Sequence, residues 1–485
     1  MGKSDEESAR ILQQQLRRRM DIVAQRFVEG MSVPNIVNYL RHNEGIEVAR
    51  DVPYQDLGRV TARRWLKYEP PMQELLSGEL KSRYALKDVY VPSYGERMAV
   101  VSSGARLCAE SIWKIAKAKA KGQAQGHPES GTERWNFPVE VPDPNLGSQI
   151  VPHKPGLAAE YTDKREREAL RPRPLVIPIH IGFSGGVTMA RAAEQLRFTL
   201  ARRVEDWEKR LKGLVLDWAR NAGAHPPTEG ILKHRFKVQV KFTLVNLVSG
   251  FDVDPRTNPI AFLTDFLRDE VLEPRTKLEL FNAMPFMETG AREVLFWGLE
   301  ALGKFRNRWK RERFDVILTS GSSIDDEHTM FRRYYDSEEL TKILADLGVE
   351  GDFLWMPVRK EGPAKVEDLR DEVAKIDGKL AALLDYEPMS LLTLEEVQEH
   401  VRGDEERGND GGDVFLILNP CSVCLKEKSR IAKAVLGLPG DQCLVTHFVC
   451  DEQTAMATLD LEDLPHPAEE DDAETGGSRE DGDAS

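Results

Sequence analysis

Hydrophobic positions recur at intervals of three and four residues between residues 8 and 40. The apolar stripe consists of Ile11, Leu16, Met20, Val23, Ala24, Phe27 and Val28, followed by Ile36, Val37 and Leu40. This spacing predicts amphipathic helices. Gly30 interrupts the pattern, Ser32 can cap the next helix, and Pro34 falls in its first turn, where a missing N–H costs nothing. Two helices joined by a glycine turn are typical of a helix-turn-helix.

A third helical pattern runs from Tyr54 to Lys67, with Leu57, Val60, Ala62 and Trp65 on its apolar side. Residues 122–174 have no such period and are rich in Pro and Gly, which favour turns over packed elements. We therefore expect an insert or an ordered loop at 122–174.

Beyond residue 174 the pattern predicts alternating strands and helices. Apolar runs or alternation indicate strands at Leu175–Ile181, Phe236–Val248, Asp315–Thr319 and Val414–Leu418, and helical spacing follows at Thr188–Ala201 and Lys428–Leu436. Continuous apolar runs are typical of strands buried on both faces. Strand, Gly-rich turn and helix in repetition predict an α/β fold with a largely parallel sheet, helices on both faces and ligands at the carboxyl ends of the strands.

The charge is distributed unevenly along the 485 residues. Of the net charge of −14, most lies in residues 451–485, which hold 13 acidic residues and one basic residue. Residues 1–125 hold 21 basic and 15 acidic residues. The basic end suits an anionic partner, and the acidic tail, 461–485, is too charged and too poor in apolar residues to fold.

Membrane, export and metal signals are weak in the sequence. No apolar stretch is long enough for a membrane span, and MGKSDEESAR lacks the apolar core of a secretory signal, so we expect a cytoplasmic protein. Five cysteines do not make a disulfide framework. Cys421 and Cys424 form a CxxC, but the spacing to Cys443 and Cys450 is unlike that of a zinc ribbon. We expect buried thiols there, with neither metal nor cofactor.

Four segments at predicted strand ends carry polar chemistry. After the first strand, Gly185 and Gly186 let the backbone approach a ligand, Ser184 and Thr188 add hydroxyls, and the following helix start favours an anion. The other three segments are 319–323 with Gly321 and Ser322, 348–353 with Asp352, and 426–430 with Lys428. Each also has a plainer interpretation: a tight turn, a serine-rich turn capping the next helix, a turn aspartate and a solvated basic turn. Together they match the groups that a phosphorylated polyol requires.

The same segments resemble the sugar-binding domain of SorC-type transcriptional regulators. The resemblance lies in LVIPIHIGFSGGVTMARAAEQL at 175–196, in 315–358 with Leu-Gly-Val-x-Gly-Asp at 347–352, in KSRIAKAVL at 428–436, in Leu444–Thr446 with 451–455, and in 84–91. The resemblance implies a domain at 80–460, similar in fold to sugar-phosphate isomerases, that binds an effector without catalysis. It implies that Gly185, Gly186, Thr188 and Lys428 meet a phosphate and that Asp352 binds hydroxyls.

Residues 22–32 resemble the helix-turn-helix opening of the same family, which implies a DNA-binding domain at 8–75. If the 54–67 helix enters the major groove of double-stranded DNA, its candidate contacts are Gln55, Arg59, Thr61, Arg63 and Arg64. Paired DNA half-sites imply a homo-oligomer, a dimer or tetramer. The plainer alternative is a basic solvated helix face, because 44–53 is inserted ahead of it.

Three functions remain open from the sequence. The first is a transcriptional regulator whose DNA binding responds to a phosphorylated sugar. The second is an isomerase or deaminase acting on sugar phosphates, which would need an acid/base pair beyond Asp352 and Glu350. The third is a sensor module whose degenerate helix-turn-helix binds protein.

Overall fold

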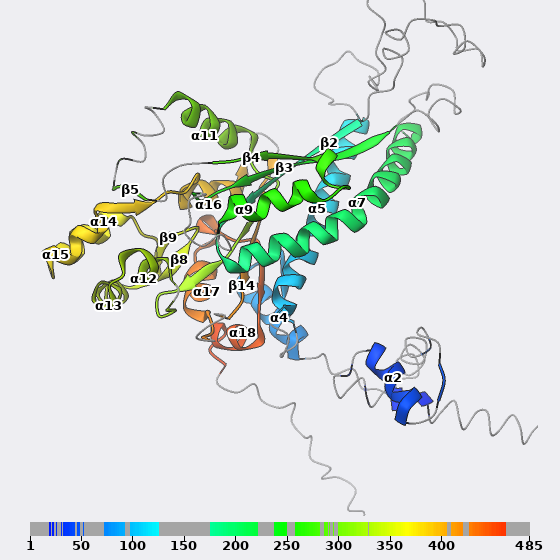
Figure 1. Ribbon diagram of the computed structural model, residues 1–485, viewed down its shortest axis with the longest axis horizontal. Coiled ribbons are helices and arrows are strands. Elements are labelled where there is room, and N and C mark those ends of the chain that lie inside the picture. The colour runs from blue at the N-terminus through cyan, green and yellow to red at the C-terminus, as the bar shows by residue number, and fades with distance from the viewer. Residues whose placement is uncertain are drawn as a thin grey trace, which may run out of the picture. The chain divides into compact units, whose positions relative to one another are not determined.

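The computed structural model describes two units of the chain, Met1–Met72 and Gln73–Ser485 (Figure 1). In the first unit it describes residues 33–43 and single positions or short runs between 19 and 52. It also describes Met72 at the end of the first unit and, in the second unit, 73–92, 98–125, 175–221, 237–249, 258–281, 286–289, 299–327, 329–404, 409–420 and 426–461, with positions 291 and 294.

The first unit has a small core built around helix α2 (Val33–Asn43). Val23, Ile36 and Leu40 are fully buried in it, and Ile22, Met31, Ile46 and Val48 pack against them. The helix predicted after Ser32 is thereby confirmed, with Pro34 as its second residue. The predicted helix at 54–67 and its five candidate DNA contacts lie outside the described residues, as does Ser32.

The second unit is organised by a seven-stranded sheet in which every neighbouring pair is parallel. Its order is β1 (Asp88–Tyr90), β15 (His447–Cys450), β14 (Asp413–Leu418), β6 (Val316–Thr319), β2 (Leu175–Phe183), β3 (Val238–Asn246) and β4 (Thr276–Glu279). The predicted α/β class with a largely parallel sheet is therefore confirmed. All four strands predicted beyond residue 174 form part of this sheet.

Helices cover both faces of the sheet, as the figure shows for α5 (Ala99–Gln125), α7 (Val187–Asn221), α9 (Pro259–Thr264) and α11 (Glu300–Glu312) (Figure 1). Ile177, Ile179 and Ile181 of β2 point into the core that α5 and α7 share. Side chains alternate along a strand, so His180 points to the opposite face, where its ring lies 5.3 Å from that of Trp309 on α11.

Two helices differ from their predicted extents. Helix α7 runs to Asn221, well past the predicted end at Ala201, because its apolar stripe continues through Val204, Trp207, Leu211 and Val215. Residues 122–125 belong to the last turn of α5, so the segment expected as an insert begins inside a helix. The rest of that segment, 126–174, lies outside the described residues.

A four-stranded antiparallel sheet lies beyond the carboxyl end of β6. Its order is β10 (Gly362–Pro363), β9 (Met356–Arg359), β8 (Val349–Phe353) and β7 (Gly321–Ser323). The interpretation of 319–323 as a turn capping the next helix is wrong, because Gly321–Ser323 pair with β8 as an edge strand. The turn interpretation of Asp352 is wrong for the same reason, since Asp352 lies within β8.

The remaining elements complete the second unit. The helices are α4 (Met72–Arg83), α12 (Met330–Tyr335), α13 (Glu338–Asp346), α14 (Val366–Ala374), α15 (Gly378–Ala381), α16 (Leu394–Arg402), α17 (Ser429–Leu436) and α18 (Glu452–Thr458). Short 3-10 turns span Asp265–Arg268, Glu273–Arg275, Ala382–Asp385 and Gly440–Gln442. The short strand pairs are β5 (Phe286–Glu288) with β11 (Tyr386–Pro388), and β12 (Gly403–Asp404) with β13 (Asn409–Asp410). Among the helices described, none is long and apolar enough to cross a membrane.

Candidate functional site

The strand order places a topological switch point between β2 and β6. From β2 the chain moves outward to β3 and β4, and it then returns to β6 on the other side of β2 before adding β14 and β15. In open parallel sheets, ligands bind outside the carboxyl ends of the strands at such a reversal. The two chain segments that leave the sheet there are Ser184–Gly186 and Ser320–Ser323.

These two segments lie against each other. The Ser184 N–H donates to the Leu318 carbonyl oxygen at 3.0 Å. Gly186 has a φ of +104°, and a Cβ added to it would lie 3.9 Å from the Ser320 Oγ. The next residues open α7, whose first N–H groups have no partner within the helix. The predicted glycine turn therefore combines a backbone conformation suited to glycine with donors aimed beyond the sheet.

Lys428 reaches the same edge from the start of α17. It is the N-cap residue of that helix, and its Nζ donates to the Gly321 carbonyl oxygen at 2.9 Å. Its backbone N–H donates to Thr454 Oγ1 at 3.3 Å, which fixes the position of the main chain. Only 7% of the residue is exposed. In the part of the chain that the structure describes, no carboxylate forms an ion pair with this ammonium group.

A buried ammonium group with a neutral partner is unfavourable unless a negative charge lies nearby. The carbonyl of Gly321 supplies a dipole but no compensating charge. An anion held beside Lys428 would remove this imbalance. The position therefore has the electrostatic character of an anion site.

Asp352 lies on the face of the small antiparallel sheet that is opposite to α17. It is directly across from Ser322, whose hydroxyl donates to the Asp352 carboxylate, and it is 5% exposed. Gly321 and Gly351 instead face α17, since a Cβ added to either would lie 3.1 Å from an Ile431 side-chain atom. The structure thus joins Gly186 to Ser320, Gly321 to Lys428, and Ser322 to Asp352. Among the described residues, no hydrogen bond or ion pair joins Asp352 to Lys428, and Thr188 lies partly exposed in the first turn of α7.

Of two further polar residues at this edge, Ser320 was predicted only as part of the segment 319–323, and Asn419 was not predicted. Ser320 faces Gly186 across the switch point. Asn419 directly follows β14 and is 6% exposed. Both are polar residues immediately after a buried apolar strand. The serine-rich motif around Ser320 and the CxxC motif after Asn419 made this signal hard to recognise in the sequence.

The histidines of the second unit that the structure describes lie away from this edge. His447 begins β15, His400 packs at Gly412 just before β14, and the backbone N–H of His180 donates to Asp315, which precedes β6, at 2.7 Å. Burial lowers the pKa of His400 and of His447 to about 4. These groups belong to the amino-terminal side of the sheet, opposite the candidate site.

The structure describes only some of the cysteines on which the metal prediction depends. Cys421 and Cys424 lie outside the described residues, whereas Cys443 is partly buried and Cys450 is buried, both as free thiols. Burial raises the pKa of each thiol. In the described ranges, no group of three His, Cys, Asp or Glu side chains is arranged to hold a metal ion.

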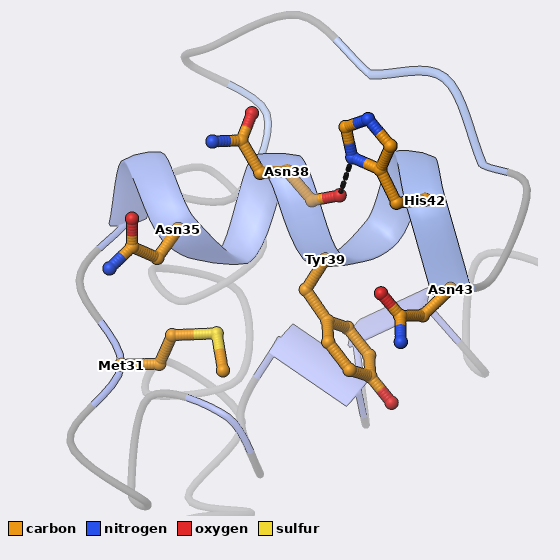
Figure 2. A pocket seen from close by; sticks show the side chains of 6 residues that line it. All are labelled: Met31, Asn35, Asn38, Tyr39, His42 and Asn43. Atoms are coloured by element: carbon orange, nitrogen blue, oxygen red, sulfur yellow. Dashed lines mark hydrogen bonds between the residues drawn. The ribbon is translucent and has the colours of Figure 1, made fainter.

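A pocket on the first unit is lined by side chains of α2 and by Met31 (Figure 2). Its lining residues are Met31, Asn35, Asn38, Tyr39, His42 and Asn43. His42 Nδ1 lies 2.8 Å from the Asn38 carbonyl oxygen, and the Arg26 guanidinium donates to the Tyr39 hydroxyl at 2.6 Å. Its lining combines the amide and imidazole groups with the apolar parts of Met31 and Tyr39.

No family model and no curated protein sequence matches the chain. Among solved structures, it is similar to the full-length sorbitol operon regulator SorC from Klebsiella pneumoniae, at 13% identity and a TM-score of 0.42, over 92% of this chain and 99% of that one. A domain of a possible sugar-binding transcriptional regulator from Arthrobacter aurescens TC1 has 12% identity and a TM-score of 0.39, over 81% and 99%. The probable sor operon regulator from Shigella flexneri has 11% identity and a TM-score of 0.41, over 80% and 99%.

These structural neighbours are regulators of the SorC type, the family that the sequence motifs resemble. Likeness at such low TM-scores carries no conclusion about what this chain binds or does.

Proposed function

We propose that the protein is a transcriptional regulator whose α/β unit binds a phosphorylated sugar at the β2/β6 switch point and whose first unit binds double-stranded DNA. Effector binding would shift the population of DNA-binding arrangements in a homo-oligomer, with no chemical step. The observation that carries the proposal is the buried ammonium group of Lys428 at the carboxyl edge of the sheet, which has no carboxylate partner among the described residues.

The groups around Lys428 favour a phosphate over a simple halide or carboxylate. A phosphate offers several acceptor oxygens, and the start of α7 and the glycine turn offer several N–H donors. Ser184, Gly185, Gly186 and Thr188 supply this side of the site, with Gly321 and Lys428 opposite. Ser322 and Asp352 form a hydroxyl–carboxylate pair on the adjoining small sheet and are proposed to meet sugar hydroxyls.

The enzyme alternative is not favoured by the described residues. Isomerase or deaminase chemistry requires an acid/base pair converging on the ligand. The Glu350 carboxylate is already held by Arg430 at 2.7 Å, and His180, His400 and His447 belong to the other side of the sheet. Steady turnover of any sugar phosphate by the purified protein would contradict the regulator proposal.

Replacement of the buried lysine tests the anion site. Lys428→Met removes the charge and shortens the side chain by only one heavy atom, so we expect the rise in Tm caused by inorganic phosphate or a sugar phosphate to be lost. Lys433→Met is the matched control, because Lys433 lies on the same helix but is exposed and pairs with Asp460. A Lys428→Met protein that responds to these anions as the wild type does would refute the site.

The DNA-binding part is tested by the salt dependence of binding. Neutralising phosphates releases counterions, so the logarithm of the affinity should fall linearly with the logarithm of the salt concentration. Arg59→Ala and Arg64→Ala should each weaken binding and reduce this slope by about 1 if the residue contacts a phosphate. Binding without salt dependence, or no DNA binding at all, would favour a sensor module that contacts protein.

A further inference from the structure

Two buried asparagines lie at the carboxyl edge of the seven-stranded sheet, and their hydrogen bonding differs. Asn246 is the last residue of β3, and Asn419 is the first residue after β14. Their exposed fractions are 0% and 6%. Buried amide side chains are normally hydrogen-bonded, because an unpaired polar atom loses its interaction with water without replacement.

Asn246 follows this rule. Its Oδ1 accepts from the Phe281 N–H at 2.7 Å, and its Nδ2 donates to the carbonyl oxygens of Phe281 at 2.6 Å and Val248 at 2.8 Å. The side chain thus ties the end of β3 to the segment that follows β4. Its role is structural.

Asn419 does not follow the rule that buried amide side chains are hydrogen-bonded. Its Oδ1 is fully buried and has no hydrogen-bond partner in the described part of the chain. A buried acceptor without a hydrogen-bond partner requires an explanation. Because Asn419 lies at the carboxyl edge of the sheet, a bound ligand is one such explanation. The oxygen can pair with a hydroxyl or an ammonium group, but it is repelled by the oxygens of a phosphate.

The strand register places Asn419 next to the proposed anion site. Leu416 of β14 is level with Thr319 of β6, so Asn419, three residues further on, emerges beside the segment that holds Gly321 and Ser322. A Cβ added to Gly321 would lie 3.7 Å from Leu418 Cδ2, which confirms that the two segments are adjacent. The Gly321 carbonyl is the group that binds Lys428.

We propose that Asn419 accepts a hydrogen bond from a hydroxyl group of the effector whose phosphate lies at Lys428, and that it makes the site select hydroxylated phosphate esters. This inference rests on the proposed function, because it needs the anion at Lys428. It adds the residue that distinguishes a phosphorylated sugar or polyol from other phosphate esters of similar size. Asn419 is a binding and specificity residue with no part in a reaction.

The test compares ligand affinities of the full chain and its variants by calorimetric titration. The probes are inorganic phosphate, n-hexyl phosphate, and glucose 6-phosphate and fructose 6-phosphate with their reduced polyol phosphates. In the wild type, the best hydroxylated ester should bind more tightly than n-hexyl phosphate. Asn419→Leu, which is close in size to the asparagine, should reduce this preference about tenfold and leave the affinity for inorganic phosphate unchanged.

Stability without ligand supplies an independent readout. Asn419→Leu removes an unpaired buried acceptor, so its Tm should equal or exceed that of the wild type. Asn246→Leu is the matched contrast, and its Tm should fall because three hydrogen bonds to the backbone are lost. If Asn419→Leu fails to fold, Asn419→Ser replaces it, with the same expected loss of preference.

The outcomes separate this inference from the proposed function. A wild type that binds phosphate esters without preferring hydroxylated ones, or an Asn419→Leu protein that keeps the preference, overturns the role of Asn419 and leaves the anion site intact. A wild type that binds none of the probes overturns both.

Discussion

At the scale of single residues, the candidate site depends on one backbone conformation and on one buried charge that has no ion-pair partner among the described residues. Gly186 has a φ of +104°, a region that side chains with a Cβ rarely adopt, and the atom nearest to an added Cβ would be 3.9 Å away. A substitution there would meet open space, so its cost comes from the backbone alone. Lys428 supplies the charge, and the Gly321 carbonyl fixes its position.

Gly186→Ala should lower the free energy of unfolding by about 1 kcal/mol, because the strain of a positive φ is of this order. It should also weaken phosphate binding, since a relaxed turn moves the N–H groups at the start of α7. Urea denaturation and calorimetric titration measure the two effects.

Gly213→Ala is the matched control: Gly213 is exposed within α7 with no atom within 4 Å of an added Cβ. That variant should gain about 0.5–1 kcal/mol, since alanine favours helices. Equal stability of Gly186→Ala and the wild type would contradict the expected strain.

At the scale of elements, much of the α/β unit could be predicted from the sequence. Apolar runs such as Val414–Leu418 are diagnostic because strands buried on both faces leave no polar alternation. The strand at 321–323 could not be predicted, since Gly-Ser-Ser has low strand propensity and is held in place by its pairing with β8. The full length of α7 could have been predicted, because its apolar stripe continues past Ala201 through Val204, Trp207, Leu211 and Val215.

Only part of the candidate site could be predicted from the sequence. The glycine turn at 184–186 was identified from residue types at a strand end, and Lys428 from a basic helix start and the family resemblance. The fold brings both to Ser320–Gly321. The meeting of these segments depends on the strand order, which places β6 beside β2 although β3 and β4 come between them in the chain. Asn419 was missed because a single polar residue after an apolar strand is a weak signal, and only the fold shows that its buried Oδ1 has no hydrogen-bond partner among the described residues.

At the scale of the whole molecule, the two sides of the sheet have different roles. The carboxyl side holds the proposed effector site, whereas the amino side is a network that fixes the strands. There, Asp413 accepts from Lys87 Nζ at 2.7 Å and from the Ser111 hydroxyl, and Lys119 pairs with Asp315 at 2.7 Å. Although burial alone would raise the pKa of Asp413, its hydrogen bonds to Lys87 and Ser111 lower it. His400 and His447 lie in the same region and are kept neutral by burial, which lowers the pKa of each to about 4.

This arrangement predicts that the protein loses stability in mild acid. An unfolded histidine has a pKa of about 6.5, so as the pH falls below that value the unfolded chain binds protons that buried His400 and His447 cannot bind. The contribution of these two histidines to the free energy of unfolding is therefore complete above about pH 6.5. It is lost progressively as the pH falls towards about 4, by at most roughly 3 kcal/mol for each histidine. Urea denaturation at a series of pH values measures this slope. His447→Gln, which keeps a polar side chain beside Thr446, should flatten the slope. An unchanged slope in His447→Gln would show that this histidine does not cause the acid sensitivity and would leave His400 as the buried histidine to test on the amino side of the sheet.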